Sequence, residues 1–97
     1  MKLGDVIASI RRKKRIGQKD MAIQLGISVS YLSQIENNSR MASSKLLNKI
    51  SDVLGVPVSA LLFEALQPSA IADEEKRRLY LQAKSVMDEM LSILLTD

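Results

Sequence analysis

The chain contains no cysteine and no histidine. Without cysteine it has no disulfide, no thiolate nucleophile and no sulfur-ligated metal site. Without histidine it lacks the commonest general base and the commonest transition-metal ligand. We therefore predict that the protein is not an enzyme and that it holds no metal ion and no other cofactor.

Aromatic residues and long apolar runs are also scarce. Aromatics make up 3% of the chain, so the 46% of apolar residues are mainly Leu, Ile, Val, Met and Ala, which suit helix packing. No segment reaches about 18 consecutive apolar residues, and the N-terminus lacks the apolar run and cleavage site of a signal peptide. The sequence predicts an all-α protein of the cytoplasm without a membrane segment.

The net charge of +3 is unevenly distributed along the 97 residues. From Met1 to Gln67, ten basic residues stand against five acidic ones, whereas from Pro68 onward four basic residues stand against six acidic ones. A chain of this length holds one compact domain and an appended element. We assign residues 1–67 to a domain that could face a polyanion and residues 68–97 to a C-terminal helical segment, with the boundary at Pro68.

Helix-spaced apolar residues, capping residues and glycine stops predict five helices in the first domain. Gly26 is expected to end the second helix in a left-handed conformation, and Ser59 to cap the fifth. Gly4 is expected only to weaken the first turn of the first helix slightly. The expected bounds are Leu3 to about Arg15, Gln18 to Leu25, Val29 to Asn37, Ser44 to Leu54, and Ala60 to about Leu66.

The second and third of these helices, joined by Gly26-Ile27-Ser28, have the pattern of a helix-turn-helix. Ala22 is small where the two helices must cross closely, and Ile27 can bury the joint. The chain resembles the phage repressor and Cro family of helix-turn-helix regulators over about residues 3 to 66. The residues that carry this resemblance are Gln18, Ala22, Gly26-Ile27-Ser28, Ile35-Glu36-Asn37 and Leu54-Gly55-Val56. The resemblance implies a five-helix lambda-repressor-like DNA-binding domain.

Two positions depart from the family pattern. Asn38 stands where the family often has Gly, and Ala42 stands where it usually has Pro. Neither change removes a base-reading group. Both are expected to loosen the loop that follows the third helix.

The resemblance implies that the third helix lies in the major groove and that certain side chains meet the DNA. Gln34 is the best candidate for a bidentate pair with adenine, and an ion pair between Arg11 and Glu36 would orient the helix. The residues assigned to base contacts are Val29, Ser30, Ser33 and Gln34. Those assigned to phosphate contacts are Gln18, Ser28, Tyr31, Asn37, Arg40 and Lys45.

Simpler interpretations exist for several of these residues. Outside the surrounding pattern, Ser30, Ser33 and Gln34 would be a solvated helix face. Tyr31 is equally compatible with the edge of the core. The basic run Arg11 to Arg15 suits a helix end, where cations complement the dipole and add a salt-dependent attraction to DNA.

One long helix, or two joined pieces, is predicted from about Ala70 to Leu95, starting from Ser69 or Asp73. An apolar seam spaced 4, 3, 4, 3 is formed by Leu79, Ala83, Val86, Met90 and Ile93. A second apolar set, which widens the seam, consists of Tyr80, Met87, Leu91, Leu94 and Leu95. We expect dimerisation through Leu79, Ala83, Val86, Met87, Met90, Ile93 and Leu94. Packing against the chain's own domain and binding of another protein remain alternatives.

These features together predict a homodimeric, sequence-specific DNA-binding transcriptional regulator. Its partners would be a double-stranded, two-fold-related operator and a second copy of the chain, and it would act as a repressor rather than an activator. A helix-turn-helix antitoxin or a restriction-modification controller would share the same DNA chemistry. A protein-interaction adaptor with an incidental basic face is the alternative from a different class.

Overall fold

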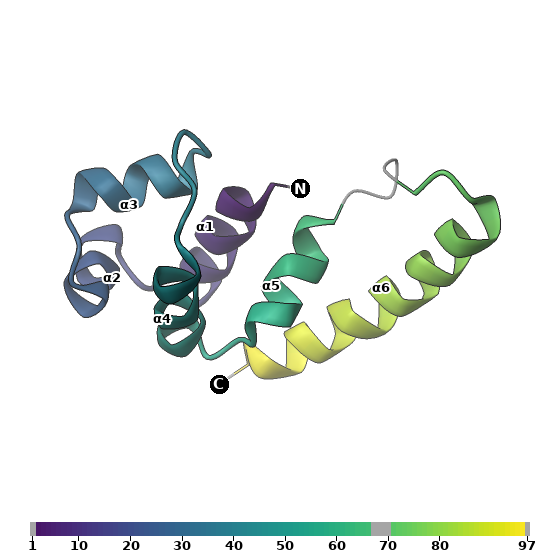
Figure 1. Ribbon diagram of the computed structural model, residues 1–97. Helices are drawn as coiled ribbons and strands as arrows, with labels where there is room; N and C mark the ends of the chain where they lie inside the picture. Colours follow the sequence, from purple (N-terminus) through teal and green to yellow (C-terminus); the bar gives the residue numbers. More distant parts are fainter. Residues whose placement is uncertain (1, 67–70, 97) are drawn as a thin grey trace.

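The computed structural model describes residues 2–66 and 71–96, which form six helices (Figure 1). No strand occurs among these residues, and the predicted all-α class is confirmed. The domain boundary expected at Pro68, and the earlier of the two expected starts of the last helix, at Ser69, lie outside the described residues. The helices are α1 (Leu3–Lys13), α2 (Gln18–Leu25), α3 (Val29–Glu36), α4 (Ser44–Leu54), α5 (Val58–Ala65) and α6 (Glu74–Leu94).

Local capping explains where these helices begin and end. The bounds of α2 and α4 agree with the prediction, and both helices end at a glycine of positive φ, Gly26 at 71° and Gly55 at 67°. The predicted cap of α5 is wrong. The carbonyl of Pro57 already accepts from the amides of Ala60 and Leu61 at 3.0 and 3.2 Å, so α5 begins directly after the proline and Ser59 lies inside it.

The core of the molecule lies where α1 to α5 meet. Its largest fully buried side chains are Ile7, Met21, Leu32, Ile50, Leu54, Val56 and Leu61. They come from all five helices and from the turn between α4 and α5, so the core closes only when every helix is present. This dependence suits short helices, which are marginal on their own.

None of the described helices is by itself long and apolar enough to cross a membrane. Within residues 2–66 and 71–96, only α4 and α5 taken together reach that length and composition, as a pair bent by 102°. Both helices contribute buried side chains to the core, including Ile50 of α4 and Leu61 of α5.

The last helix, α6, runs back alongside α5 towards α1 (Figure 1). The Tyr80 ring stacks on Phe63 with centroids 5.2 Å apart, and the Tyr80 hydroxyl donates to the Leu66 carbonyl at 3.0 Å. Leu91 belongs to the core cluster, and Met87 packs against it. One face of α6 is therefore bound to the chain's own domain.

Lys84 adds a polar attachment between α5 and α6. Its ammonium donates to Glu64 Oε2 of α5 at 2.9 Å and to Asp88 Oδ1 at 3.0 Å. Burial alone would lower the pKa of Lys84, but the bonds to these two carboxylates outweigh it and raise the pKa above its ordinary value. The cationic form is thus favoured at the helix junction.

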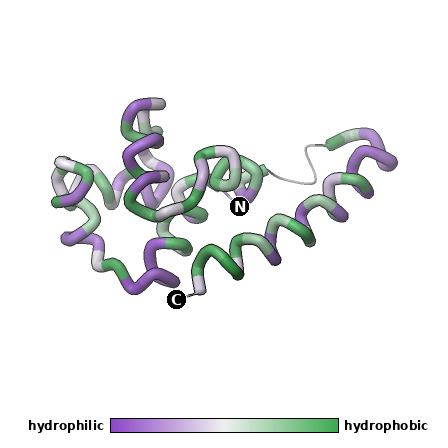
Figure 2. The backbone as a smooth tube through the Cα atoms, turned by 90° about the horizontal axis from the view of Figure 1, so that it is seen from below, coloured by the Kyte–Doolittle hydropathy of each residue, from purple (hydrophilic) through white to green (hydrophobic). Residues whose placement is uncertain are grey.

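An exposed apolar stripe runs along one side of α6, and apolar residues extend along the helix towards its C-terminal end (Figure 2). The side chains of Leu79, Val86, Met90, Ile93 and Leu94 are between 45% and 70% exposed, and Ala83 is exposed with them. Met87, which was expected in the same surface, lies on the inner face instead. The apolar residues of α6 therefore divide into a docked set and an exposed set.

The docking of α6 predicts different effects for the same substitution at two of its positions. Leu91→Ala should lower the free energy of unfolding by about 2 kcal/mol or more, since it removes a buried leucine. Leu81→Ala, on the exposed side of the same helix, should change it by less than about 0.5 kcal/mol. Urea unfolding at matched protein concentration measures both. Equal effects would mean that α6 does not pack on its own domain.

Candidate nucleic-acid interface

The third helix, α3, combines a buried inner face with a polar outer face. Ser28 caps it by accepting from the Tyr31 amide at 3.0 Å, and Leu32 and Ile35 are buried beneath it. The four residues predicted to contact bases lie in its first two turns. Val29 and Ser30 are exposed, while Ser33 and Gln34 are half-buried. A short helix with its small polar side chains on the open side is suited to enter a major groove.

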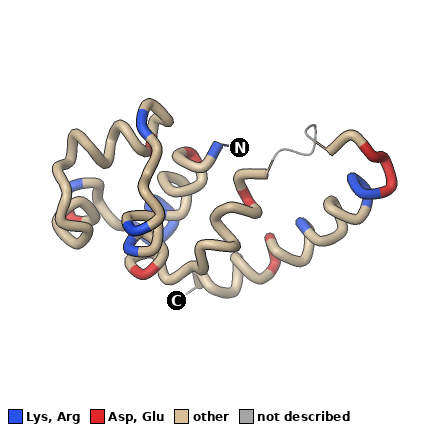
Figure 3. Tube along the Cα trace, viewed as in Figure 1, with Lys and Arg blue, Asp and Glu red and all other residues tan. Residues whose placement is uncertain are grey.

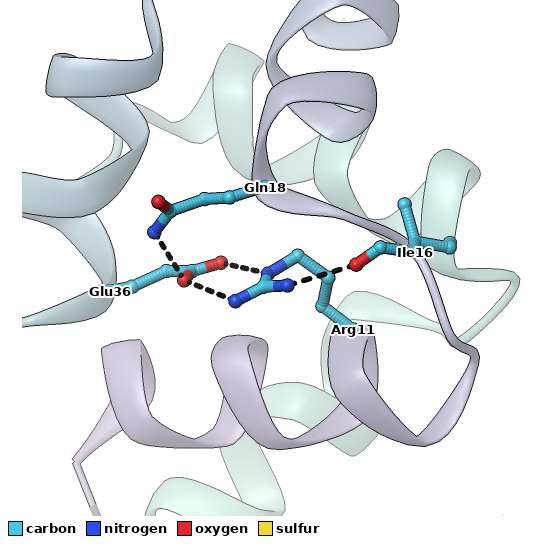
Figure 4. Close-up of polar contacts among 4 residues, drawn as sticks. All are labelled: Arg11, Ile16, Gln18 and Glu36. Carbon is cyan, nitrogen blue, oxygen red and sulfur yellow. Dashed lines mark hydrogen bonds and ion pairs between the residues drawn. The ribbon is translucent and has the colours of Figure 1, made fainter.

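Arg11 of α1 and Glu36 of α3 form a buried two-point ion pair (Figure 4). Arg11 Nε donates to Glu36 Oε2 at 2.7 Å, and Arg11 Nη2 donates to Glu36 Oε1 at 3.0 Å. Their side chains are only 10% and 6% exposed. The contact was predicted from the resemblance, and the two residues do meet.

Two further groups complete this cluster. Gln18 Nε2 of α2 donates to Glu36 Oε1 at 2.9 Å, and Arg11 Nη1 donates to the Ile16 carbonyl at 2.9 Å (Figure 4). The carboxylate of Glu36 is near the C-terminal end of α3, where the helix dipole disfavours a negative charge, so it depends on these donors. The cluster holds α1, α2 and α3 together at one point.

The loop after α3 is ordered by its own side chains. Asn37 Oδ1 accepts from the Ser39 amide at 2.9 Å and contacts the Ser39 hydroxyl. The Arg40 guanidinium lies 5.2 Å from the centroid of the Tyr31 ring, close enough for a cation–π contact. Tyr31 also packs against the edge of the core, so it has the structural role that the sequence left open.

Asn38 tightens this loop instead of loosening it. It adopts a φ of 67°, and its side chain accepts from the Gly4 amide at 2.9 Å and donates to Asp5 Oδ1 at 3.1 Å. A glycine at this position would make neither bond. The expectation of a looser loop was wrong for Asn38 because the side chain reaches α1, 34 residues away in the sequence.

The role of Gly4 was also missed by sequence reasoning. Gly4 is buried, and a Cβ atom there would lie 2.8 Å from the Glu36 carbonyl oxygen and still closer to that of Ile35. Gly4 is therefore required for the close approach of α1 to the end of α3. No local signal reveals this, since a glycine near a helix start has many other uses.

The residues predicted to contact phosphates surround α3 on several elements. Ser28 lies at its N-terminal end, Asn37 and Arg40 lie in the loop after it, and Lys45 is in the first turn of α4. Gln18 is half-buried and already engaged with Glu36. The basic residues near these elements, and the acidic and basic groups at the start of α6, are seen in Figure 3. The DNA contacts of Gln18, Ser28, Tyr31, Asn37, Arg40 and Lys45 remain predictions.

The buried pair predicts a contrast between single and double substitutions. Glu36→Gln should lower the free energy of unfolding by about 3 kcal/mol, because it leaves the Arg11 charge buried without a counterion. The double variant Arg11→Met with Glu36→Leu should recover most of that loss. Chemical unfolding of the three proteins measures the difference. A double variant less stable than the single one would contradict this interpretation of the pair.

Comparison with known proteins supports the same assignment. A family model described as helix-turn-helix matches residues 7–61. The ImmF control region 10 kDa protein of Bacillus phage phi105 is 36% identical over 66 residues, which are 68% of this chain and 73% of the relative. The immunity repressor protein of the same phage is 33% identical over 64 residues, which are 66% of this chain and only 44% of the relative. The chain therefore spans less than half the length of that repressor.

Solved structures extend the likeness to the fold. Two crystal structures of the clp gene regulator ClgR from Corynebacterium glutamicum are similar to this chain, with TM-scores of 0.62 and 0.64. The first is 33% identical and covers 65% of this chain and 82% of its own. The second is 25% identical and covers 95% of this chain and 85% of its own, so this likeness reaches into α6. The chain belongs to the helix-turn-helix family of the phage repressor and Cro type, a family of DNA-binding transcriptional regulators.

Proposed function

We propose that the chain is a repressor that binds a two-fold-related DNA operator as a homodimer, with α3 in the major groove. The observation that carries this proposal is that α3 has some side chains fixed inside the domain and others free to contact another molecule. Glu36 and Ile35 are held inside the domain, whereas the side chains of Ser30, Ser33 and Gln34 make no hydrogen bond to another described residue. Groups held at a fixed angle with unused donors and acceptors are suited to read base edges.

Sequence preference would come from the outer face of α3. The Gln34 amide can donate to adenine N7 and accept from its N6 amino group, and the serine hydroxyls can adapt to either kind of partner. The Val29 side chain, 41% exposed, can contact a thymine methyl group. Arg40 and Lys45 would neutralise phosphates on either side and supply affinity that depends on salt.

Pairing of two copies would use the exposed face of α6. One helix-turn-helix reads too few base pairs for strong specificity, and a dimer places two recognition helices about 34 Å apart, one DNA turn. The exposed leucines, methionine, isoleucine and valine of α6 would be buried against the same residues of a second copy. Repression would follow from occupation of the operator, and the likeness to a phage immunity repressor supports this sign of regulation.

The first test concerns base recognition. Sites selected from a random DNA pool should show a consensus with two related half-sites, and Gln34→Ala should reduce discrimination at one base pair per half-site by about 1–3 kcal/mol. Affinity for unrelated DNA at the same salt concentration should be unchanged. Gln24→Ala, an exposed glutamine of α2, is the matched control and should keep the preference. If Gln34→Ala selects the same consensus as the wild type, the assignment of α3 fails.

The second test concerns pairing. Truncation before α6 would also remove Tyr80 and Leu91 from the fold, so a single outward substitution is the cleaner experiment. Val86→Glu should give monomers in sedimentation velocity, because it buries a carboxylate in the paired surface. Ser85→Glu, the exposed neighbour on the same helix, should remain dimeric. A wild-type chain that is monomeric both free and on DNA would exclude the homodimer.

A further inference from the structure

We propose that Asn38 and Gly4 form a second attachment of the recognition helix and that Asn38 is a positioning residue for DNA binding. The inference rests on the proposed function, since it concerns the angle at which α3 meets the major groove. It goes beyond the Arg11–Glu36 pair, which holds the same helix from another point of α1.

Asn38 lies in the loop directly after α3, and this loop is hydrogen-bonded to the last turn of the helix. Its amide donates to the Ile35 carbonyl at 3.1 Å, and the amides of Ser39 and Arg40 both donate to the Gln34 carbonyl, at 3.0 and 3.2 Å. The chain thus turns back onto the last turn of α3. A displacement of Asn38 would be transmitted directly to the backbone of Gln34.

The side chain of Asn38 joins this turn to the first residues of α1. Asn38 Oδ1 accepts from the Gly4 amide, which is one of the free donors at the N-terminal end of a helix. Asn38 Nδ2 donates to Asp5 Oδ1. One amide group therefore satisfies a donor and an acceptor at once, and both belong to the same turn of α1.

Two separate contacts with α1 restrict the rotation of α3 more than a single contact can. Gly4 and Arg11 are seven residues apart on α1, which corresponds to about 10 Å at a rise of roughly 1.5 Å per residue. With the Arg11–Glu36 pair alone, the end of α3 could still pivot about that point. The second attachment at Gly4 restricts the pivot, so the ion pair and the Asn38 amide together set the angle of α3.

The hydrogen bond between Asn38 and Gly4 depends on the close approach of the two backbones at Gly4. Because Gly4 has no side chain, the backbone of α1 approaches the Ile35 and Glu36 carbonyls more closely than an alanine would allow. The Asn38 side chain can bridge only while this approach is maintained. Gly4→Ala would push α1 away from the end of α3 and so break the hydrogen bonds of the Asn38 side chain.

Asn38→Gly tests the inference because glycine keeps the left-handed backbone, with φ of 67°, and removes only the side chain. Affinity for the site selected by the wild type should fall roughly three- to tenfold, the equivalent of about one hydrogen bond, the part-buried bond to Gly4, because the bond to Asp5 is exposed and competes with water. Affinity for unrelated DNA and the dependence of binding on salt should not change. The Gly4 amide should lose its protection from hydrogen exchange.

Exchanging the two side chains, so that the net charge is unchanged, should restore the specific DNA affinity. Asn38→Asp alone places two carboxylates side by side and should weaken specific binding further. Adding Asp5→Asn restores an amide donor opposite the new carboxylate, which can also accept from the Gly4 amide, so specific affinity should return to within about twofold of the wild type. Because the rescue restores the same hydrogen bonds and hence stability, the ratio of specific to non-specific affinity is the deciding measurement, since a loss of stability alone would leave that ratio unchanged.

The outcomes separate the two proposals. If the wild type selects a consensus and Asn38→Gly keeps the same ratio of specific to non-specific affinity, the positioning role of Asn38 is refuted and the proposed function stands. If the wild type shows no sequence preference at all, the proposed function fails and the positioning role fails with it. Loss of the ratio in Asn38→Gly together with rescue by the double exchange supports both.

Discussion

The orientation of α3 depends on a charged contact that has been removed from water. Arg11 donates two hydrogen bonds to Glu36 at side-chain exposures of 10% and 6%, and Gln18 donates a third to the same carboxylate. A buried guanidinium or carboxylate without its partner is strongly unfavourable, whereas hydrophobic replacement of both groups is often tolerated. The contact therefore restricts how α1 and α3 can move apart, and its contribution is to geometry more than to stability.

Around this contact, the side chains that hold α3 in place are distinct from those that are free to contact another molecule. Leu32 and Ile35 are buried, Ser28 caps the helix, and the loop after it folds back on the Gln34 carbonyl. The side chains of Ser30, Ser33 and Gln34 are polar and make no hydrogen bond to another described residue, and Val29 is exposed beside them. This arrangement is what a reading surface requires, because a base edge is distinguished only by donors and acceptors held at a defined angle.

The C-terminal helix α6, like α3, has one side fixed to the domain and another side exposed. Tyr80, Lys84 and Leu91 attach α6 to α5 and the core, and the face carrying Val86 and Ile93 stays exposed. Packing on its own domain and pairing with a second copy are thus compatible, although they appeared as alternatives at the level of sequence. A helix fixed in this way would present its apolar face at a constant angle to the recognition helix.

The all-α class, the order of the helices, most of their bounds and the contact between Arg11 and Glu36 can all be predicted from the amino-acid sequence. These follow from local features, namely caps, glycine stops and helical periodicity, together with the resemblance carried by the helix-turn-helix motif. The bridge between Gly4 and Asn38 and the division of α6 into a docked and an exposed set depend instead on how distant segments pack. Periodicity identifies which residues share a helix face, but the packing angle between distant segments decides which face is covered.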